Sequence, residues 1–155
     1  MLAAIWLLAA ETNLLAQNEA VPAPKDTIFA RKILMGTIDM NMDEVETMLA
    51  PGGKLDETDA REHLNTISVL LLAFPHLFPA ATNQWKAGAD RDAALDTFAS
   101  PELWSSFADF YKRASDASKI AFEASRATRL DDFKKLVSEL RDECNSCHGR
   151  FLKAE

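Results

Sequence analysis

Hydrophobic residues recur every three or four positions along most of the chain, which is the spacing of one face of an α-helix. The first such pattern predicts a helix from about Asp26 to Ala50, with Asp26 as its N-cap. Pro51-Gly52-Gly53 ends this helix. One charged residue, Arg31, falls on its apolar stripe. That stripe consists of Ile28, Met35, Ile38, Met42, Val45 and Leu49.

A second pattern predicts a helix that begins at Asp56 or Thr58 and ends at Phe74, just before Pro75. Its apolar stripe consists of Ala60, Leu64, Ile67, Leu71 and Phe74. Residues 69–74 are apolar on every side, which predicts a deeply buried helix end. Residues 75–99 have the pattern of a long irregular connection, within which we predict a short helix around residues 91–98.

The third predicted helix begins with a clear start signal. Ser100 is a predicted N-cap, Pro101 suits the first helical position, and Glu102 complements the helix dipole. Its apolar stripe consists of Leu103, Phe107, Phe110, Ala114, Ala117, Ala121 and Ala124. The small alanine side chains would let a neighbouring helix, or a flat ring, approach closely.

The fourth predicted helix follows Thr128, and residues 128–131 form a variant of the capping box. Its apolar face consists of Phe133, Leu136, Leu140, Cys144, Cys147 and Phe151. Four amphipathic helices without alternating strand patterns predict an all-α fold, an antiparallel four-helix bundle. Cofactor sites in such bundles are built from side chains that face the interior.

The first ten residues form an uninterrupted apolar run. This run is too short to span a bilayer, which takes about 20 residues. It resembles the apolar region of a secretory signal, although the usual basic residues before it are missing. Ala10 and Ala16 are candidate cleavage points. We therefore predict a signal peptide over residues 1–16 and a bundle domain over residues 17–155; an apolar first helix is the alternative.

Composition fits a globular, water-soluble domain, with 48% apolar and 26% charged residues. The formal net charge of −7 argues against a nucleic-acid partner, because phosphate binding requires a basic surface. An acidic protein would instead attract a basic partner protein. No set of residues typical of hydrolytic or phosphoryl-transfer catalysis stands out, so we predict that the protein is not an enzyme.

The last helix carries the sequence Cys144-Asn-Ser-Cys147-His148, which is the attachment signature of a c-type haem. Two thiols at this spacing can add to the two vinyl groups of one porphyrin, and the next imidazole can then bind the iron. A thioredoxin-like dithiol would need a preceding strand, and a zinc site would need further ligands. The chain contains no other cysteine. We therefore predict one covalently attached haem c, with Cys144 and Cys147 as thioether links and His148 as axial iron ligand.

The chain resembles the class II c-type cytochromes, the cytochrome c′ family, over roughly residues 25–153. The resemblance depends on Arg31-x-x-x-Met35, Phe74-Pro75-x-x-Phe78-Pro79, Pro101-Glu102-Leu103-Trp104 and Cys144-x-x-Cys147-His148-x-x-Phe151. It implies that Arg31 contacts a haem propionate and that Met35 lies on the distal side of the iron. It also implies homodimers through the first two helices in the high-spin branch. Leu152 departs from the family pattern, in which a basic residue follows the axial histidine by four positions.

Met35 separates two interpretations of function. Our leading interpretation is a periplasmic one-electron carrier of the low-spin branch, with His148 and Met35 as axial ligands, which passes electrons to redox partner proteins. A thioether is a soft ligand that raises the reduction potential, although a methionine at helical spacing is most often part of the core. The alternative is a five-coordinate, high-spin protein that binds nitric oxide or carbon monoxide. A haem-free bundle with free or disulfide-bonded cysteines is the third possibility.

Overall fold

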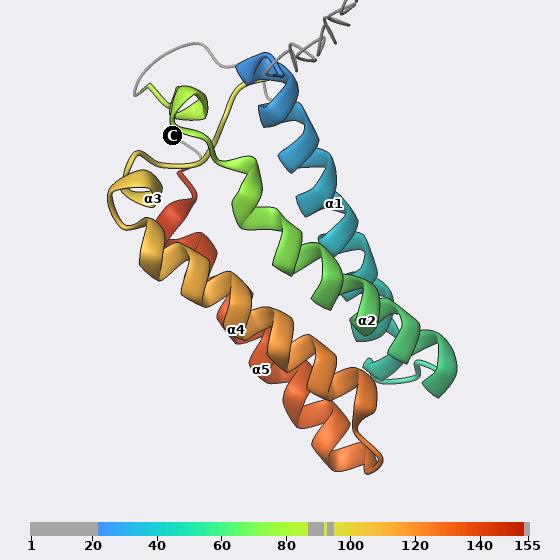
Figure 1. Ribbon diagram of the computed structural model, residues 1–155. Helices are drawn as coiled ribbons and strands as arrows, with labels where there is room; N and C mark the ends of the chain where they lie inside the picture. Colours follow the sequence, from blue (N-terminus) through green and yellow to red (C-terminus); the bar gives the residue numbers. More distant parts are fainter. Residues whose placement is uncertain (1–21, 87–91, 93–94, 154–155) are drawn as a thin grey trace, which may run out of the picture.

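The computed structural model describes residues 22–86, 92 and 95–153, and the regular elements in these residues are helices (Figure 1). Their bounds are α1 Pro24–Leu49, α2 Glu57–Ala73, η1 Phe74–Leu77, η2 Ala80–Thr82, α3 Glu102–Ser105, α4 Phe107–Arg126 and α5 Leu130–Phe151. The predicted all-α bundle is confirmed. The predicted signal peptide, residues 1–16, lies outside the described residues.

The four long helices of the described chain, α1, α2, α4 and α5, form the bundle, and each runs antiparallel to the one before it (Figure 1). α1 packs on α2, α2 on α4, and α4 on α5. None of the helices formed by the described residues is long and apolar enough to cross a membrane. The connection between α2 and α3 contains the short 3₁₀ helices η1 and η2. The short helix predicted around residues 91–98 is not present in residues 95–98, and its first half falls largely outside the described residues.

Two hydrophobic clusters form the core. The larger one joins all four long helices and includes Val45, Ala60, Leu64 and Leu140, none of which has measurable solvent exposure. The second consists of Phe74, Phe78, Leu103, Phe110 and Phe151, at the end where η1, α3 and the end of α5 meet. Its rings pack edge to face, with 4.8 Å between the centroids of Phe78 and Phe110.

The prediction that residues 69–74 are deeply buried was wrong for part of this segment. Val69 and Leu72 are 59% and 55% exposed, whereas Leu71 and Phe74 are buried. Among the long helices, α2 packs mainly against α1 and α4, and the side of α2 that carries Val69 and Leu72 is exposed although these side chains are apolar. Phe107, which we placed on the stripe of the third helix, is also partly exposed.

The helix starts show where local sequence signals were overridden. Asp56 caps α2 as predicted, and its side chain accepts hydrogen bonds from the amides of Thr58 and Asp59. The prediction for Asp26 was wrong, because Ala23 caps α1 and Pro24 is its first residue. Proline suits that position, since the first helical N–H has no partner in the helix. The capping box at Thr128 was also wrong: Arg129 is the N-cap of α5, without a side-chain capping bond.

Ser100 is not an N-cap. Its amide donates to the carbonyl of Phe151. Ala99, just before Ser100, and Leu152, just after Phe151, form an isolated antiparallel bridge. This pairing with the end of α5 fixes the backbone before the helix, which begins only after Pro101. The predicted third helix is also divided at Ser106. Its φ of −119° and ψ of 35° are not helical, and they separate α3 from α4.

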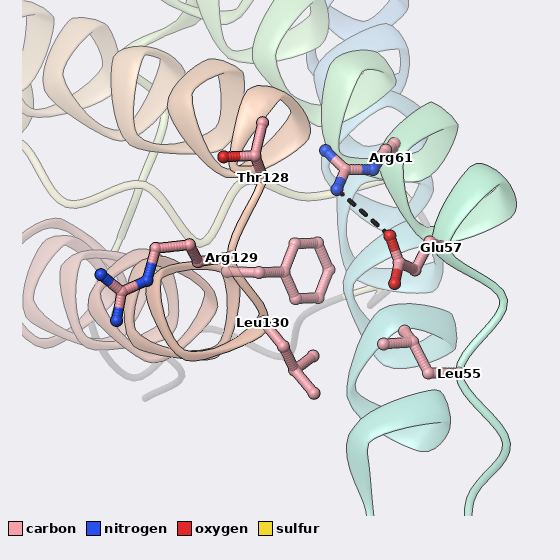
Figure 2. Close-up of a pocket in the computed structure, with 7 residues that line it drawn as sticks. Leu55, Glu57, Arg61, Thr128, Arg129 and Leu130 are labelled. Atoms are coloured by element: carbon pink, nitrogen blue, oxygen red, sulfur yellow. Dashed lines mark hydrogen bonds and ion pairs between the residues drawn. The ribbon is translucent and has the colours of Figure 1, made fainter.

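At the other end of the bundle, which we call the closed end, residues of α2 and of the turn between α4 and α5 line a small pocket (Figure 2). Here Arg61 of α2 donates to the carbonyl of Ser125 at the end of α4 and pairs with Glu57 at 3.4 Å. A pocket of about 10 Å³ lies between Leu55, Glu57, Arg61, Thr128, Arg129, Leu130 and Phe133. A single water molecule needs about that much space, so this pocket holds no larger ligand.

Candidate haem site

A cavity of about 470 Å³ lies among the four long helices, next to the aromatic cluster. This volume is in the range of small-molecule and cofactor sites in proteins, about 300–1,000 Å³. All five residues that the sequence singled out line it: Arg31 and Met35 from α1, and Cys144, Cys147 and His148 from α5. The two helices are far apart in the sequence, and folding brings their candidate residues to one place.

The two cysteines lie on the inner side of α5, three residues apart, as the helical pattern predicted. Both are free thiols and half-buried. Cys144 packs against the larger core cluster and Cys147 against the aromatic cluster. Burial raises the pKa of the Cys144 thiol and raises that of Cys147 to about 11. Both thiols are therefore protonated at neutral pH.

His148 follows Cys147 directly, lines the cavity and is exposed. Desolvation by its surroundings lowers the pKa of the imidazole; Asp39 opposes this effect and Arg141 adds to it. The neutral ring that results is the form that binds metals.

Most of the cavity wall opposite α5 is apolar. The apolar side chains that α1, α2, η1 and α4 contribute to it include Met35, Ile38, Met42, Ile67, Leu71, Phe74, Phe110, Ala114 and Ala117. The charged lining residues of α1 and α4 are Arg31, Lys32, Asp39 and Arg113. Ala114 and Ala117 of α4 belong to this lining, and their small side chains would let a flat ring approach α4 closely. The described residues contain no group of three or more His, Cys, Asp or Glu side chains that could hold a metal ion. The cavity thus offers thiols, an imidazole, a largely apolar surface and several charged side chains.

Arg31 is 4% exposed at the edge of this cavity. Its guanidinium donates to the hydroxyl of Thr82 at 3.0 Å and to the hydroxyl of Thr97. It also lies over the ring of Phe78, 4.5 Å from the centroid. No ion pair links it to a carboxylate of the described residues, and burial lowers its pKa to about 10.

A buried guanidinium without an anionic partner is costly, and a carboxylate is its best complement. The propionate groups of a haem are carboxylates, so Arg31 fits the group that the cysteines and His148 imply. Thr82 and Thr97, which hold Arg31, were missed by sequence reasoning. They lie 51 and 66 residues from Arg31, in the irregular connection, and no local pattern marks them.

Two further charged groups surround the motif. Arg113 of α4 contacts Asp109, Glu143 and Ser146, and so ties α4 to the residues on either side of Cys144. Arg141 of α5 faces α1, where Glu46 accepts two hydrogen bonds from it. Sequence reasoning assigned no role to Arg141 or to this pair, because the two residues lie 95 positions apart.

Comparisons with known proteins identify the family of this chain. A profile of the family described as Cytochrome C' matches residues 26–152. No curated protein matches the chain by sequence. Cytochrome c′ from Thermochromatium tepidum has a similar structure, with 20% sequence identity and a TM-score of 0.72, over 85% of this chain and 98% of that one.

Two other solved structures are of the same fold. A cytochrome c′ described as having an unusual ligand-controlled dimer dissociation is 18% identical over 86% of this chain and 99% of that one, with a TM-score of 0.73. A structure of oxidised R. palustris cytochrome c556 is 24% identical over 84% of this chain and 98% of that one, with a TM-score of 0.68. The match over nearly all of the described bundle means that this chain belongs to the cytochrome c′ family of electron-transfer or gas-binding proteins, and that it carries one covalently attached haem.

Proposed function

We propose that this protein is an exported, five-coordinate haem protein that binds nitric oxide or carbon monoxide. In this proposal Cys144 and Cys147 form the thioether links, His148 is the axial ligand, and Arg31 pairs with a propionate. The bound haem supplies an iron with one open coordination position for a diatomic ligand. The role of the protein is to hold the imidazole on one side and to shape the apolar space on the other.

The packing of Met35 carries the proposal. Its half-buried side chain contacts both the larger core cluster and the aromatic cluster, as a residue of the wall does. Ile38, Ile67 and Leu71 continue the same wall. These side chains carry no charge and no hydrogen-bonding group, so this part of the wall suits a small neutral ligand.

A one-electron carrier with Met35 bound to the iron is the second candidate. It is favoured by the position of Met35, whose thioether lines the same cavity as His148. Thioether and imidazole together give a carrier with a raised reduction potential. An acidic protein of this kind would dock with a basic redox partner.

Absorption spectra of the purified holoprotein separate the two candidates. The proposal predicts a high-spin ferric spectrum and ready carbon monoxide binding after reduction, both retained in Met35→Ala. The carrier predicts a low-spin ferric spectrum with the weak near-infrared methionine-to-iron band, which Met35→Ala abolishes. Met40→Ala is the matched control, because Met40 lies on the same helix but is 70% exposed. A low-spin wild type with the methionine band would refute the five-coordinate proposal.

A homodimer through the outer face of α1 is part of the proposal. Phe29, Ile33 and Met40 are separated by four and seven residues, lie on one side of α1, and are at least half exposed. An apolar line of this kind is typical of an interface between proteins. Sedimentation velocity should show a dimer that Ile33→Asp dissociates. A monomeric wild type at micromolar concentration would exclude this interface.

Export with loss of residues 1–16 completes the proposal, because haem is attached to this motif outside the bacterial cytoplasm. The intact mass of the holoprotein purified from the periplasm measures the cleavage point and the added haem together. A full-length chain retained in the cytoplasm would contradict it.

A further inference from the structure

The helices that carry Met35 and His148 are joined by one charged cluster. α1 and α5 both line the cavity, and the packing between neighbouring helices runs through α2 and α4. Among the described residues, every ion pair between α1 and α5 involves Arg141. We call Arg141 and its three carboxylate partners, Asp39, Asp43 and Glu46, the Arg141 cluster.

Arg141 makes a bidentate contact with Glu46 and two longer ion pairs with Asp39 and Asp43. Nε and Nη2 of Arg141 each donate to one carboxylate oxygen of Glu46 at 2.8 Å. Asp43 lies 3.5 Å from Nη2 and Asp39 lies 3.7 Å from Nη1. Two parallel bonds fix the orientation of the guanidinium as well as its distance from α1. The Arg141 side chain is 28% exposed and that of Glu46 is 38% exposed, so both are partly shielded from water.

The cluster lies directly beside the candidate axial residues. Asp39 is one helical turn after Met35 on α1, and both line the cavity. Arg141 is two turns before His148 on the same side of α5, and both line the cavity as well. A change in the distance between Arg141 and α1 therefore changes the distance between the turn of Met35 and the turn of His148.

We propose that Arg141 is a positioning residue: through Glu46, Asp39 and Asp43 it sets the separation of α1 from α5, and thereby the width of the space beside Met35 that a diatomic ligand must enter. This inference rests on the proposed haem site. It does not depend on whether Met35 binds the iron, since the same separation governs the approach of Met35 in either case.

The test compares Arg141→Gln, Arg141→Lys and the wild-type holoprotein. Glutamine removes the charge and the bidentate contact, whereas lysine keeps the charge and one bond. Hydrogen exchange of amides 35–46 should become roughly tenfold faster in Arg141→Gln and less so in Arg141→Lys. Carbon monoxide association with the reduced protein should accelerate in the same order. Exposed and half-exposed ion pairs contribute little to global stability, so these variants are expected to fold.

Arg61→Gln is the matched control, because Arg61 also bridges two helices but at the closed end of the bundle. It should leave exchange at 35–46 and carbon monoxide association unchanged. The inference would be overturned if hydrogen exchange at amides 35–46 were unchanged in Arg141→Gln. It would also be overturned if exchange rates rose equally over α1, α2 and α4. If Arg141→Gln does not fold, Glu46→Gln tests the same bidentate contact from the other helix.

The two proposals fail separately. A low-spin wild type refutes the five-coordinate iron, but the inference then predicts that Arg141→Gln weakens the methionine band while Arg61→Gln does not. Retention of the full band in Arg141→Gln would refute the inference in that case.

Discussion

The surroundings of Arg31 indicate the chemistry of the group that would bind beside it. It is a buried cation at a cavity edge, held by the hydroxyls of Thr82 and Thr97. Neutral hydroxyls orient the guanidinium but do not balance its charge. A haem propionate at this edge would do so, and Arg31 would in turn stabilise the reduced state of the iron.

Replacement of Arg31 by glutamine should therefore lower the midpoint potential of the holoprotein. Loss of a positive charge close to the haem favours the ferric state, by on the order of 50 mV if the charge acts through an effective dielectric constant of about 20. Potentiometric titration measures the shift. Arg31→Lys keeps the charge and should shift the potential less. A potential that is unchanged or higher in Arg31→Gln would contradict the assignment of Arg31 to a propionate.

At the scale of elements, the starts of the helices show how tertiary contacts can override a local sequence signal. Asp56 and Ser100 carry the same kind of sequence signal, yet only Asp56 makes capping hydrogen bonds. Ser100 is fully buried, and its hydroxyl has no hydrogen-bond partner among the described residues. Its amide is engaged by the end of α5 instead. Tertiary pairing thus displaced a local cap.

This difference predicts opposite results from two alanine substitutions. Asp56→Ala should lower the free energy of unfolding by about 1 kcal/mol, the usual loss of an N-cap. Ser100→Ala should change it by less than about 0.5 kcal/mol, because it removes a buried hydroxyl that makes no bond. Urea denaturation of the two holoproteins measures both values. An equal loss in the two variants would mean that Ser100 does cap its helix.

The whole molecule has two unlike ends. At the closed end, fully buried side chains such as Ala60, Leu64 and Leu140 pack without room for a ligand. At the other end, α1, α2, α4 and α5 surround a cavity that is lined largely by apolar side chains. The haem end therefore depends on a bound group for its packing, whereas the closed end does not.

Removal of the haem should thus loosen one end before the other. The double variant Cys144→Ala/Cys147→Ala cannot form the thioether links. Its amides in η1, α3 and the last two turns of α5 should lose protection against hydrogen exchange. Amides near Leu64 and Leu140 should keep most of theirs. A uniform loss over the whole bundle, or no loss at all, would show that the two ends are not independent in this way.

Periodicity along the chain determined the helices, because the side chains of a helix repeat every 3.6 residues whatever the rest of the protein does. The spacing of Cys144, Cys147 and His148 predicted a covalently attached haem, which family membership confirms, and its attachment to the last helix stays a prediction from the same local pattern. Tertiary structure alone decided the partners of Arg31 and Arg141, the exposure of Val69 and Leu72, the break at Ser106 and the loss of the cap at Ser100. These features join residues far apart in the sequence, or depend on which side of a helix finds a neighbour. Such pairings are set by how the chain folds back on itself, and a pattern of nearby residues does not contain that information.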